Sequence, residues 1–127
     1  MTTKKILIAE DDPFILDIYS HQFRSEGFTV DLANDGQMAL DKLKSEYFDL
    51  LVLDIDLPKV NGIEILENLK STGMLTRVKI VVLSNYDEKA LSDKYQVDIE
   101  SFGIVKYFLK VSITPEEISK AIKEILK

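Results

Sequence analysis

Carboxylate side chains gather in two short stretches of the sequence. Glu10, Asp11 and Asp12 lie in "IAEDDP", directly after an apolar run. Asp54 and Asp56 lie in "LDIDLP", at the end of another apolar run. Crowded carboxylates repel one another and are driven toward protonation unless a cation neutralises them. Hard oxygen ligands favour Mg²⁺ or Ca²⁺, and a cluster with few protein ligands and room for water favours Mg²⁺.

A hydroxyl group and an ammonium group follow two further apolar runs. Ser84 ends the run "VVLS", and Lys110 ends the run "IVKYFLK". An aspartate beside Mg²⁺ can hold a phosphoryl group when fixed positive charge and a hydroxyl donor offset the charge of the phosphoryl oxygens. The residue types therefore indicate a phosphoryl-accepting aspartate.

Strand-like runs alternate five times with helix-like segments, and this order predicts how the polar residues are brought together. The runs suit strands that are covered on both faces, which favours a parallel sheet in a doubly wound α/β fold. In such folds a ligand site lies beyond the carboxyl ends of the strands. The predicted strands are 4–9, 28–33, 49–54, 78–84 and 104–110, and the predicted helices lie in 13–26, 34–48, 63–73, from about 87, and 115–125.

The first and last helices have the clearest start signals. Pro13 opens the first helix, and apolar residues recur behind it at helical spacing. Thr114 is a predicted N-cap, Pro115 takes the first helical position, and Glu117 completes a capping box. The segment 85–103 is the least regular, with a short helix expected from about Asp87.

Composition limits the classes of protein that the chain can belong to. Its 127 residues suit one domain, 1–127, with a net charge of −6 that disfavours direct binding of nucleic acid. The chain contains no cysteine and one histidine, which argues against a disulfide framework and against thiolate or histidine-rich metal sites. The first apolar run is too short for a signal peptide, and no stretch approaches a membrane-spanning length, so we expect a cytoplasmic protein with protein partners.

Two of these motifs resemble the receiver domain of two-component response regulators, in particular chemotaxis regulators. The stretch "ILIAEDD" is similar to the acidic pair of that family and places the pair at Glu10 and Asp11. The stretch "LVLDIDLPKVNG" is similar to the phosphoacceptor segment and makes Asp54 the phosphorylated aspartate, with Pro58 and Gly62 as its loop companions. The resemblance covers essentially the whole chain.

The resemblance also implies roles for four other residues. Asp56 would offer Mg²⁺ its backbone carbonyl, beside the carboxylates of the acidic pair and the acceptor. Ser84 takes the hydroxyl position, Tyr107 the aromatic switch position, and Lys110 the position of the phosphate-contacting lysine. The implied fold is flavodoxin-like, with five helices and a five-stranded parallel sheet in the order 2-1-3-4-5.

The implied function is that of a switch, not an enzyme beyond its own phosphorylation and dephosphorylation. A histidine kinase, a phosphotransfer protein or a small phosphodonor would transfer a phosphoryl group to Asp54 in the presence of Mg²⁺. Ser84 would then move to bond a phosphoryl oxygen, and Tyr107 would turn inward. The resulting change of surface would alter contacts with a downstream protein target or an output domain.

Three features depart from the family pattern. Val111 follows Lys110 where the family has a proline joined by a cis bond, and a cis bond before valine would cost about 2.5–4 kcal/mol, so we expect a trans bond. Asn85 is larger than the residue that usually follows the hydroxyl. Ser84 and Lys110 are 26 positions apart, several more than usual, and the extra residues fall around the fourth helix.

Two other functions stay open at this point. The chain could be a pseudo-receiver, an interaction module that keeps the fold without switching. The "LDIDLP" stretch also resembles the aspartate-x-aspartate motif of haloacid-dehalogenase-type phosphatases, with Asp54 as nucleophile and Asp56 as general acid. That motif normally follows the first strand, whereas here it follows the third. The sequence leaves open the kinase, the target, the oligomeric state, and whether the chain is a fragment of a longer regulator.

Overall fold

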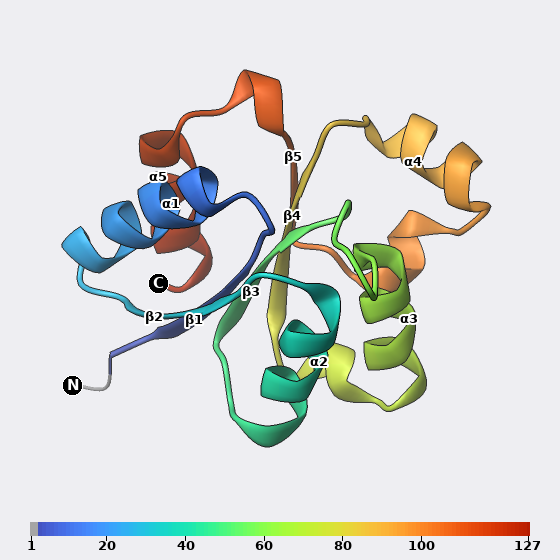
Figure 1. Ribbon diagram of the computed structural model, residues 1–127, viewed down its shortest axis with the longest axis horizontal. Coiled ribbons are helices and arrows are strands. Elements are labelled where there is room, and N and C mark those ends of the chain that lie inside the picture. Colours follow the sequence, from blue (N-terminus) through green and yellow to red (C-terminus); the bar gives the residue numbers. More distant parts are fainter. Residues whose placement is uncertain (1–2) are drawn as a thin grey trace.

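A five-stranded parallel sheet, covered by helices on both faces, forms the centre of the molecule (Figure 1). The computed structural model describes residues 3–127, so residues 1 and 2 of the predicted domain lie outside the described residues. The strands are β1 (Lys5–Ala9), β2 (Thr29–Ala33), β3 (Leu50–Asp54), β4 (Lys79–Ser84) and β5 (Lys106–Leu109). The α-helices are α1 (Pro13–Ser25), α2 (Gly36–Ser45), α3 (Gly62–Ser71), α4 (Glu88–Tyr95) and α5 (Pro115–Ile125), and the 3-10 helices are η1 (Met74–Thr76), η2 (Ile99–Phe102) and η3 (Lys110–Ser112).

The strand order is β2-β1-β3-β4-β5, with every pair parallel, which confirms the predicted doubly wound fold. α1 and α5 lie together on one face of the sheet, and α2 and α3 lie on the other (Figure 1). Each face has its own buried apolar cluster, one including α1 and α5 and the other including α2 and α3. Within the described residues, no helix is both long and apolar enough to cross a bilayer.

The register of the central strands brings the predicted polar residues to one edge of the sheet. Ala9 pairs with Leu53, so the residues that follow β1 lie beside the end of β3. Asp54 pairs with Leu83, so Ser84 extends one residue past it on the neighbouring strand. The reversal of strand order falls between β1 and β3, the place where a doubly wound sheet opens a crevice at its carboxyl edge.

Side-chain caps fix where the helices begin. The carboxylate of Asp12 accepts a hydrogen bond from the backbone N–H of Phe14 at 2.9 Å, with Pro13 in the first turn of α1. Thr114 and Glu117 form the predicted capping box of α5, in which each side chain binds the other residue's backbone N–H. The third acid of the "EDD" run is thus the N-cap of α1.

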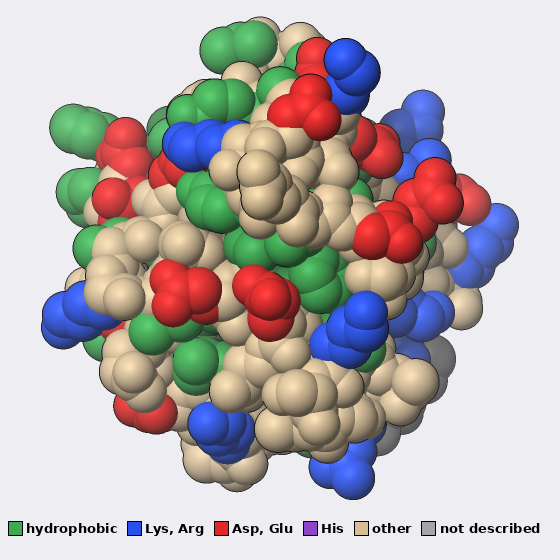
Figure 2. All heavy atoms as spheres, turned by 90° about the vertical axis from the view of Figure 1, so that its right-hand side faces the viewer, with side chains coloured by type: hydrophobic (Ala, Val, Ile, Leu, Met, Phe, Trp, Pro, Cys, Tyr) green, Lys and Arg blue, Asp and Glu red, His purple; other side chains and the backbone are tan. Residues whose placement is uncertain are grey.

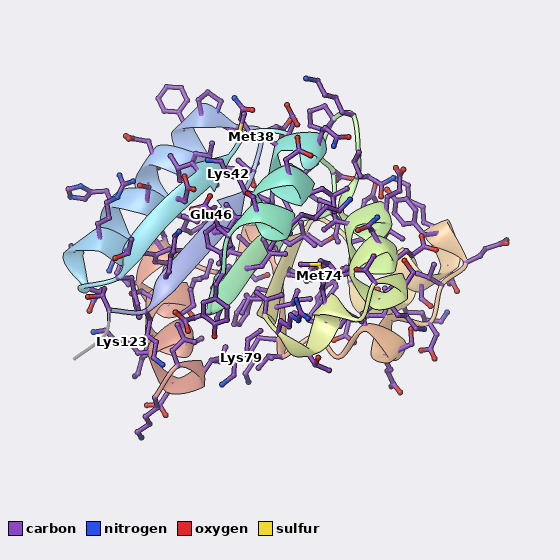
Figure 3. The ribbon with its side chains drawn as sticks, turned by 90° about the horizontal axis from the view of Figure 1, so that it is seen from below. Met38, Lys42, Glu46, Met74, Lys79 and Lys123 are labelled. Carbon is purple, nitrogen blue, oxygen red and sulfur yellow. The ribbon has the colours of Figure 1, made fainter. Side chains whose placement is uncertain are left out.

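The opposite edge of the sheet is held by lysine contacts with the helix ends, and two of these lysines, Lys79 and Lys123, are labelled in Figure 3. The ammonium of Lys79, at the start of β4, donates to the carbonyl of Ile125 at 3.0 Å. Lys123 in α5 forms an ion pair with Glu26, which caps the end of α1. Cations at helix C-termini offset the partial negative charge there, so these contacts stabilise the packing of α1, α5 and the sheet.

Residues 85–103 contain more structure than their irregular sequence pattern suggests. α4 begins after the N-cap Asp87, as predicted, but only Leu91 of this helix is buried. After α4 the chain forms η2, which buries Ile99 and Phe102 in the apolar cluster that includes the buried side of α3. The ammonium of Lys70 in α3 lies 5.7 Å from the centre of the Phe102 ring. Figure 2 shows this face of the molecule, with hydrophobic surface at its centre between acidic side chains.

Candidate functional site

Three carboxylates meet at the carboxyl edge of the sheet, where β1 and β3 end. One oxygen each from Glu10, Asp11 and Asp54 lie within 4.8 Å of one another. Glu10 and Asp54 are each only 2% exposed, whereas Asp11 is exposed to solvent. The structure therefore brings together the acidic pair and the acceptor that the sequence motifs predicted, with one side of the cluster open to water.

Lys110 joins the two buried carboxylates. Its ammonium nitrogen lies 2.9 Å from Oε2 of Glu10 and 2.9 Å from Oδ2 of Asp54. The other oxygen of each acid accepts a backbone hydrogen bond, from the N–H of Asp12 to Glu10 at 3.2 Å and from the N–H of Asp56 to Asp54 at 3.1 Å. Both acids are thus held in a fixed orientation by the turns that follow β1 and β3.

The charges at this site are unbalanced. Burial raises the pKa of Glu10 to about 7, the neighbouring charge of Asp54 adds to this, and Lys110 opposes it only in part. Burial disfavours the charged form of Lys110, but its contacts with Asp54 and Glu10 outweigh that effect and raise its pKa. One ammonium therefore faces three carboxylates, and further positive charge would be stabilised there.

This donor set fits Mg²⁺. All three side chains offer carboxylate oxygens, which Mg²⁺ prefers, and the exposed side of Asp11 leaves room for the water ligands that this ion usually keeps. Asp56 is exposed beside the cluster, and its N–H orients Asp54. The use of its backbone carbonyl as a metal ligand stays a prediction.

Ser84 and Tyr107 meet at the loop after β4 and not at the carboxylates themselves. Ser84 is fully buried, and its hydroxyl oxygen accepts a hydrogen bond from the N–H of Tyr86 at 3.0 Å. The half-buried Tyr107 donates its hydroxyl to the carbonyl of Tyr86 at 2.6 Å. Burial raises the pKa of Tyr107, and a hydrogen bond with Ser84 opposes this in part. Ser84 and Tyr107 are thus linked through the backbone of Tyr86, which each of them contacts.

The sequence analysis did not identify Tyr86 or Lys94. The ammonium of Lys94 donates to the hydroxyl of Tyr86 at 2.9 Å. The two residues are eight positions apart, across the irregular loop and most of α4, so neither a motif nor a simple helical spacing connects them. Rules for residue spacing on a helix do not apply to this pair, because Tyr86 lies before α4 and Lys94 lies within it.

Two large apolar side chains are exposed next to the site. Phe14, four residues after Glu10, is 79% exposed, and Val111, directly after Lys110, is 87% exposed. The peptide bond between Lys110 and Val111 is trans, as expected for a bond that precedes valine. Exposed apolar groups of this size mark surfaces that contact other proteins when they lie together.

Comparison with known proteins gives a consistent result. A family model described as "Response regulator receiver domain" matches residues 6–123. The transcriptional regulatory protein PhoP of Bacillus subtilis is 34% identical over 124 residues, which cover 98% of this chain and 49% of PhoP. The response regulator PmrA of Pseudomonas aeruginosa is 46% identical over 77 residues, 61% of this chain and 35% of PmrA. The chain thus spans half or less of the length of these relatives.

Solved structures show the same fold. A CheY-like receiver domain protein from Methanospirillum hungatei superimposes with a TM-score of 0.83 and 29% identity, covering 98% of this chain and 94% of that one. The response regulator TrrA of Thermotoga maritima, solved in complex with Mg²⁺-BeF, superimposes with a TM-score of 0.77 and 28% identity, covering 97% and 99% of the two chains.

Proposed function

The chain belongs to the response regulator receiver domains of two-component systems, and we propose that Asp54 accepts a phosphoryl group in a Mg²⁺-dependent reaction that switches protein contacts. Receiver domains are signalling domains and generally not enzymes. The observation that carries the proposal is the single ammonium of Lys110, 2.9 Å from both Asp54 and Glu10, inside a cluster of three carboxylates. Such a site is short of positive charge and open to solvent on one side.

The reaction forms a bond between an Asp54 carboxylate oxygen and the phosphorus atom of the donor. The bond from phosphorus to the donor's nitrogen or oxygen breaks, and the leaving group keeps the bonding electron pair. Lys110 offsets negative charge on the phosphoryl oxygens, and the N–H of Asp56 orients the attacking carboxylate. Mg²⁺, held by Glu10, Asp11 and Asp54 with the Asp56 carbonyl, would supply the remaining positive charge.

Phosphorylation would be read out through Ser84 and Tyr107. It adds about one to two negative charges at Asp54. The oxygen of Ser84 accepts from the N–H of Tyr86, and its hydroxyl hydrogen would turn to a phosphoryl oxygen once Asp54 is phosphorylated. Ser84 and Tyr107 both bond to the backbone of Tyr86, so a change at one hydroxyl would alter the position of the other. The outer surface near β5 would then change its affinity for a downstream protein or output domain.

The donor must approach the open side of the carboxylate cluster. The exposed side chains of Phe14 and Val111 follow Glu10 and Lys110 closely in the sequence, and an apolar partner surface would cover them on docking. A histidine kinase or a phosphotransfer protein presents a phosphohistidine and fits this role. These partners, and the assignment of residues 1–127 to one receiver domain, are part of the proposal.

The test is intact mass after incubation with acetyl phosphate and Mg²⁺. The parent chain should gain one phosphoryl group, whereas Asp54→Asn and a sample with chelated Mg²⁺ should gain none. An adduct that persists in Asp54→Asn would place the reaction at another residue and contradict the proposal.

Two further measurements separate the alternative functions. A phosphatase would turn over p-nitrophenyl phosphate many times, whereas a receiver removes only its own phosphoryl group. A pseudo-receiver would show no change in the amide resonances of Ser84 and Tyr107 when beryllofluoride and Mg²⁺ are added, whereas a switching receiver should show shifts at both.

A further inference from the structure

Tyr86 is the point at which the polar contacts of the loop after β4 converge. Its N–H donates to Ser84, its carbonyl accepts from Tyr107, and its hydroxyl accepts from Lys94. The first two contacts involve the residues that read out the state of Asp54 in the proposed function. Any displacement of the Tyr86 backbone would therefore move the hydrogen-bond partners of both Ser84 and Tyr107.

Lys94 holds Tyr86 through more than one interaction. Its ammonium lies 4.4 Å from the centre of the Tyr86 ring and 5.4 Å from that of Tyr95, in addition to the 2.9 Å hydrogen bond. A cation over an aromatic face is attracted by the ring quadrupole. The pKa of Lys94 is raised chiefly by its hydrogen bond with Tyr86.

We propose that Lys94 and Tyr86 form a latch that positions Ser84 and Tyr107 to receive a phosphoryl group on Asp54. This inference rests on the proposed function and adds residues outside the receiver motifs. With the latch closed, the Tyr86 backbone donates through its N–H to the oxygen of Ser84 and fixes the position of that hydroxyl group. It also binds the Tyr107 hydroxyl in the position that the ring takes in this structure.

The latch is a positioning device, because neither of its side chains contacts the carboxylates. Without the ammonium, the Tyr86 ring loses its hydrogen-bond donor and its cation, and the loop between Ser84 and α4 gains freedom. Only a fraction of the molecules then holds Ser84 and Tyr107 in the arrangement that binds a phosphoryl group. The apparent affinity for that group falls in proportion to this fraction. An exposed cation–aromatic contact of this kind supports a change of about two- to fivefold.

The experiment compares three lysine variants by their Kd for beryllofluoride in the presence of Mg²⁺. Lys94→Met removes the charge and keeps an apolar stem. Lys94→Arg keeps a cation that can lie over the Tyr86 ring. Lys89→Met is the matched control, since Lys89 is exposed on the same helix and forms a long ion pair with Asp93, at 3.9 Å. Thermal unfolding of each variant verifies that the fold is retained.

The latch predicts a Kd about two- to fivefold higher for Lys94→Met, restored toward the parent value in Lys94→Arg and unchanged in Lys89→Met. In metal-free protein, Lys94→Met should also shift the amide resonances of Ser84 and Tyr107. An unchanged Kd with unchanged resonances would overturn the inference, and so would a loss that arginine does not restore. A parent chain that fails to bind beryllofluoride would instead overturn the proposed function, and the metal-free resonances would then decide whether the latch exists.

Discussion

Glu10 is buried beside Asp54, so two carboxylates share the ammonium of Lys110 in the absence of any other cation. Burial and the charge of Asp54 together raise the pKa of Glu10 to about 7. The ordinary pKa of this side chain is 4.5, so between these two values the folded protein binds more protons than the unfolded chain. The stability that Glu10 contributes is therefore present below pH 4.5 and is lost as the pH rises toward 7.

Replacement of Glu10 with glutamine should remove this loss of folding stability at rising pH. In protein freed of divalent cations, the parent should lose up to about 3 kcal/mol of unfolding free energy from this source between pH 4.5 and pH 7. Glu10→Gln should show a flatter profile, because glutamine carries no charge to bury. Urea unfolding at a series of pH values measures the difference. Parallel profiles for the two proteins would show that Glu10 has an ordinary pKa.

At the scale of elements, α2 depends on close contact with the loop between β3 and α3. A Cβ atom on Gly36 would lie 1.5 Å from the carbonyl oxygen of Val60, and the N–H of Gly36 donates to the carbonyl of Pro58 at 3.1 Å. The sequence analysis placed a helix within 34–48 without a start signal, and in the structure Gly36 is the first residue of that helix and is buried. The sequence alone does not distinguish a glycine that close packing requires from a glycine that a positive φ angle requires.

Gly36→Ala should therefore destabilise the protein by at least about 2 kcal/mol, since the backbone of the loop must move to admit a methyl group. The neighbouring variant Gln37→Ala is the control, because it loses only an exposed hydrogen bond to Asp41. Urea unfolding compares the two. A decrease in unfolding free energy of less than about 0.5 kcal/mol in Gly36→Ala would mean that the start of α2 and the loop at Val60 can move apart at little energetic cost.

The hydrophobic pattern and the capping residues predicted the strands and helices well, apart from the segment after β4. Strong local signals, such as the apolar run of β3 and the Thr114–Glu117 capping box, specify their elements without help from distant residues. η2 differs, because Ile99 and Phe102 become core residues only by packing against α3, more than 25 positions earlier. No local rule predicts that contact.

At the scale of the whole molecule, the predicted site depended on fold and motif together. The doubly wound sheet brings four distant chain segments to one edge, and the motifs identified which residues there bear charge. The roles of Asp56, Ser84 and Tyr107 rest on the family resemblance, because the one hydrogen bond of these three residues with the carboxylates is that of the Asp56 N–H with Asp54. Tyr86 and Lys94 could not be predicted, since their contact depends on how α4 sits above the loop.

Binding of Mg²⁺ to this edge should stabilise the entire fold, because its carboxylates come together only when β1 pairs with β3 in the centre of the sheet. At a Mg²⁺ concentration 100 times Kd, the unfolding free energy should rise by about 2.7 kcal/mol. Asp11→Asn should lose most of this gain. Asp12→Asn should keep most of it, since asparagine can still cap α1. Thermal unfolding with and without Mg²⁺ measures the gain, and equal losses in both variants would argue against the assigned ligand set.

The position of η2 bears on how such a domain could diverge. Ser84 and Lys110 are fixed by β4 and β5, which pair directly, so the path of the chain between them does not set the distance between the two residues. Ile99 and Phe102 anchor the longer path on the side of α3, away from the carboxylates. Insertions and deletions around η2, beyond Tyr86 and Lys94, can therefore accumulate without a change in the chemistry, and a lineage could gain new recognition surfaces there while its phosphorylation site stays the same.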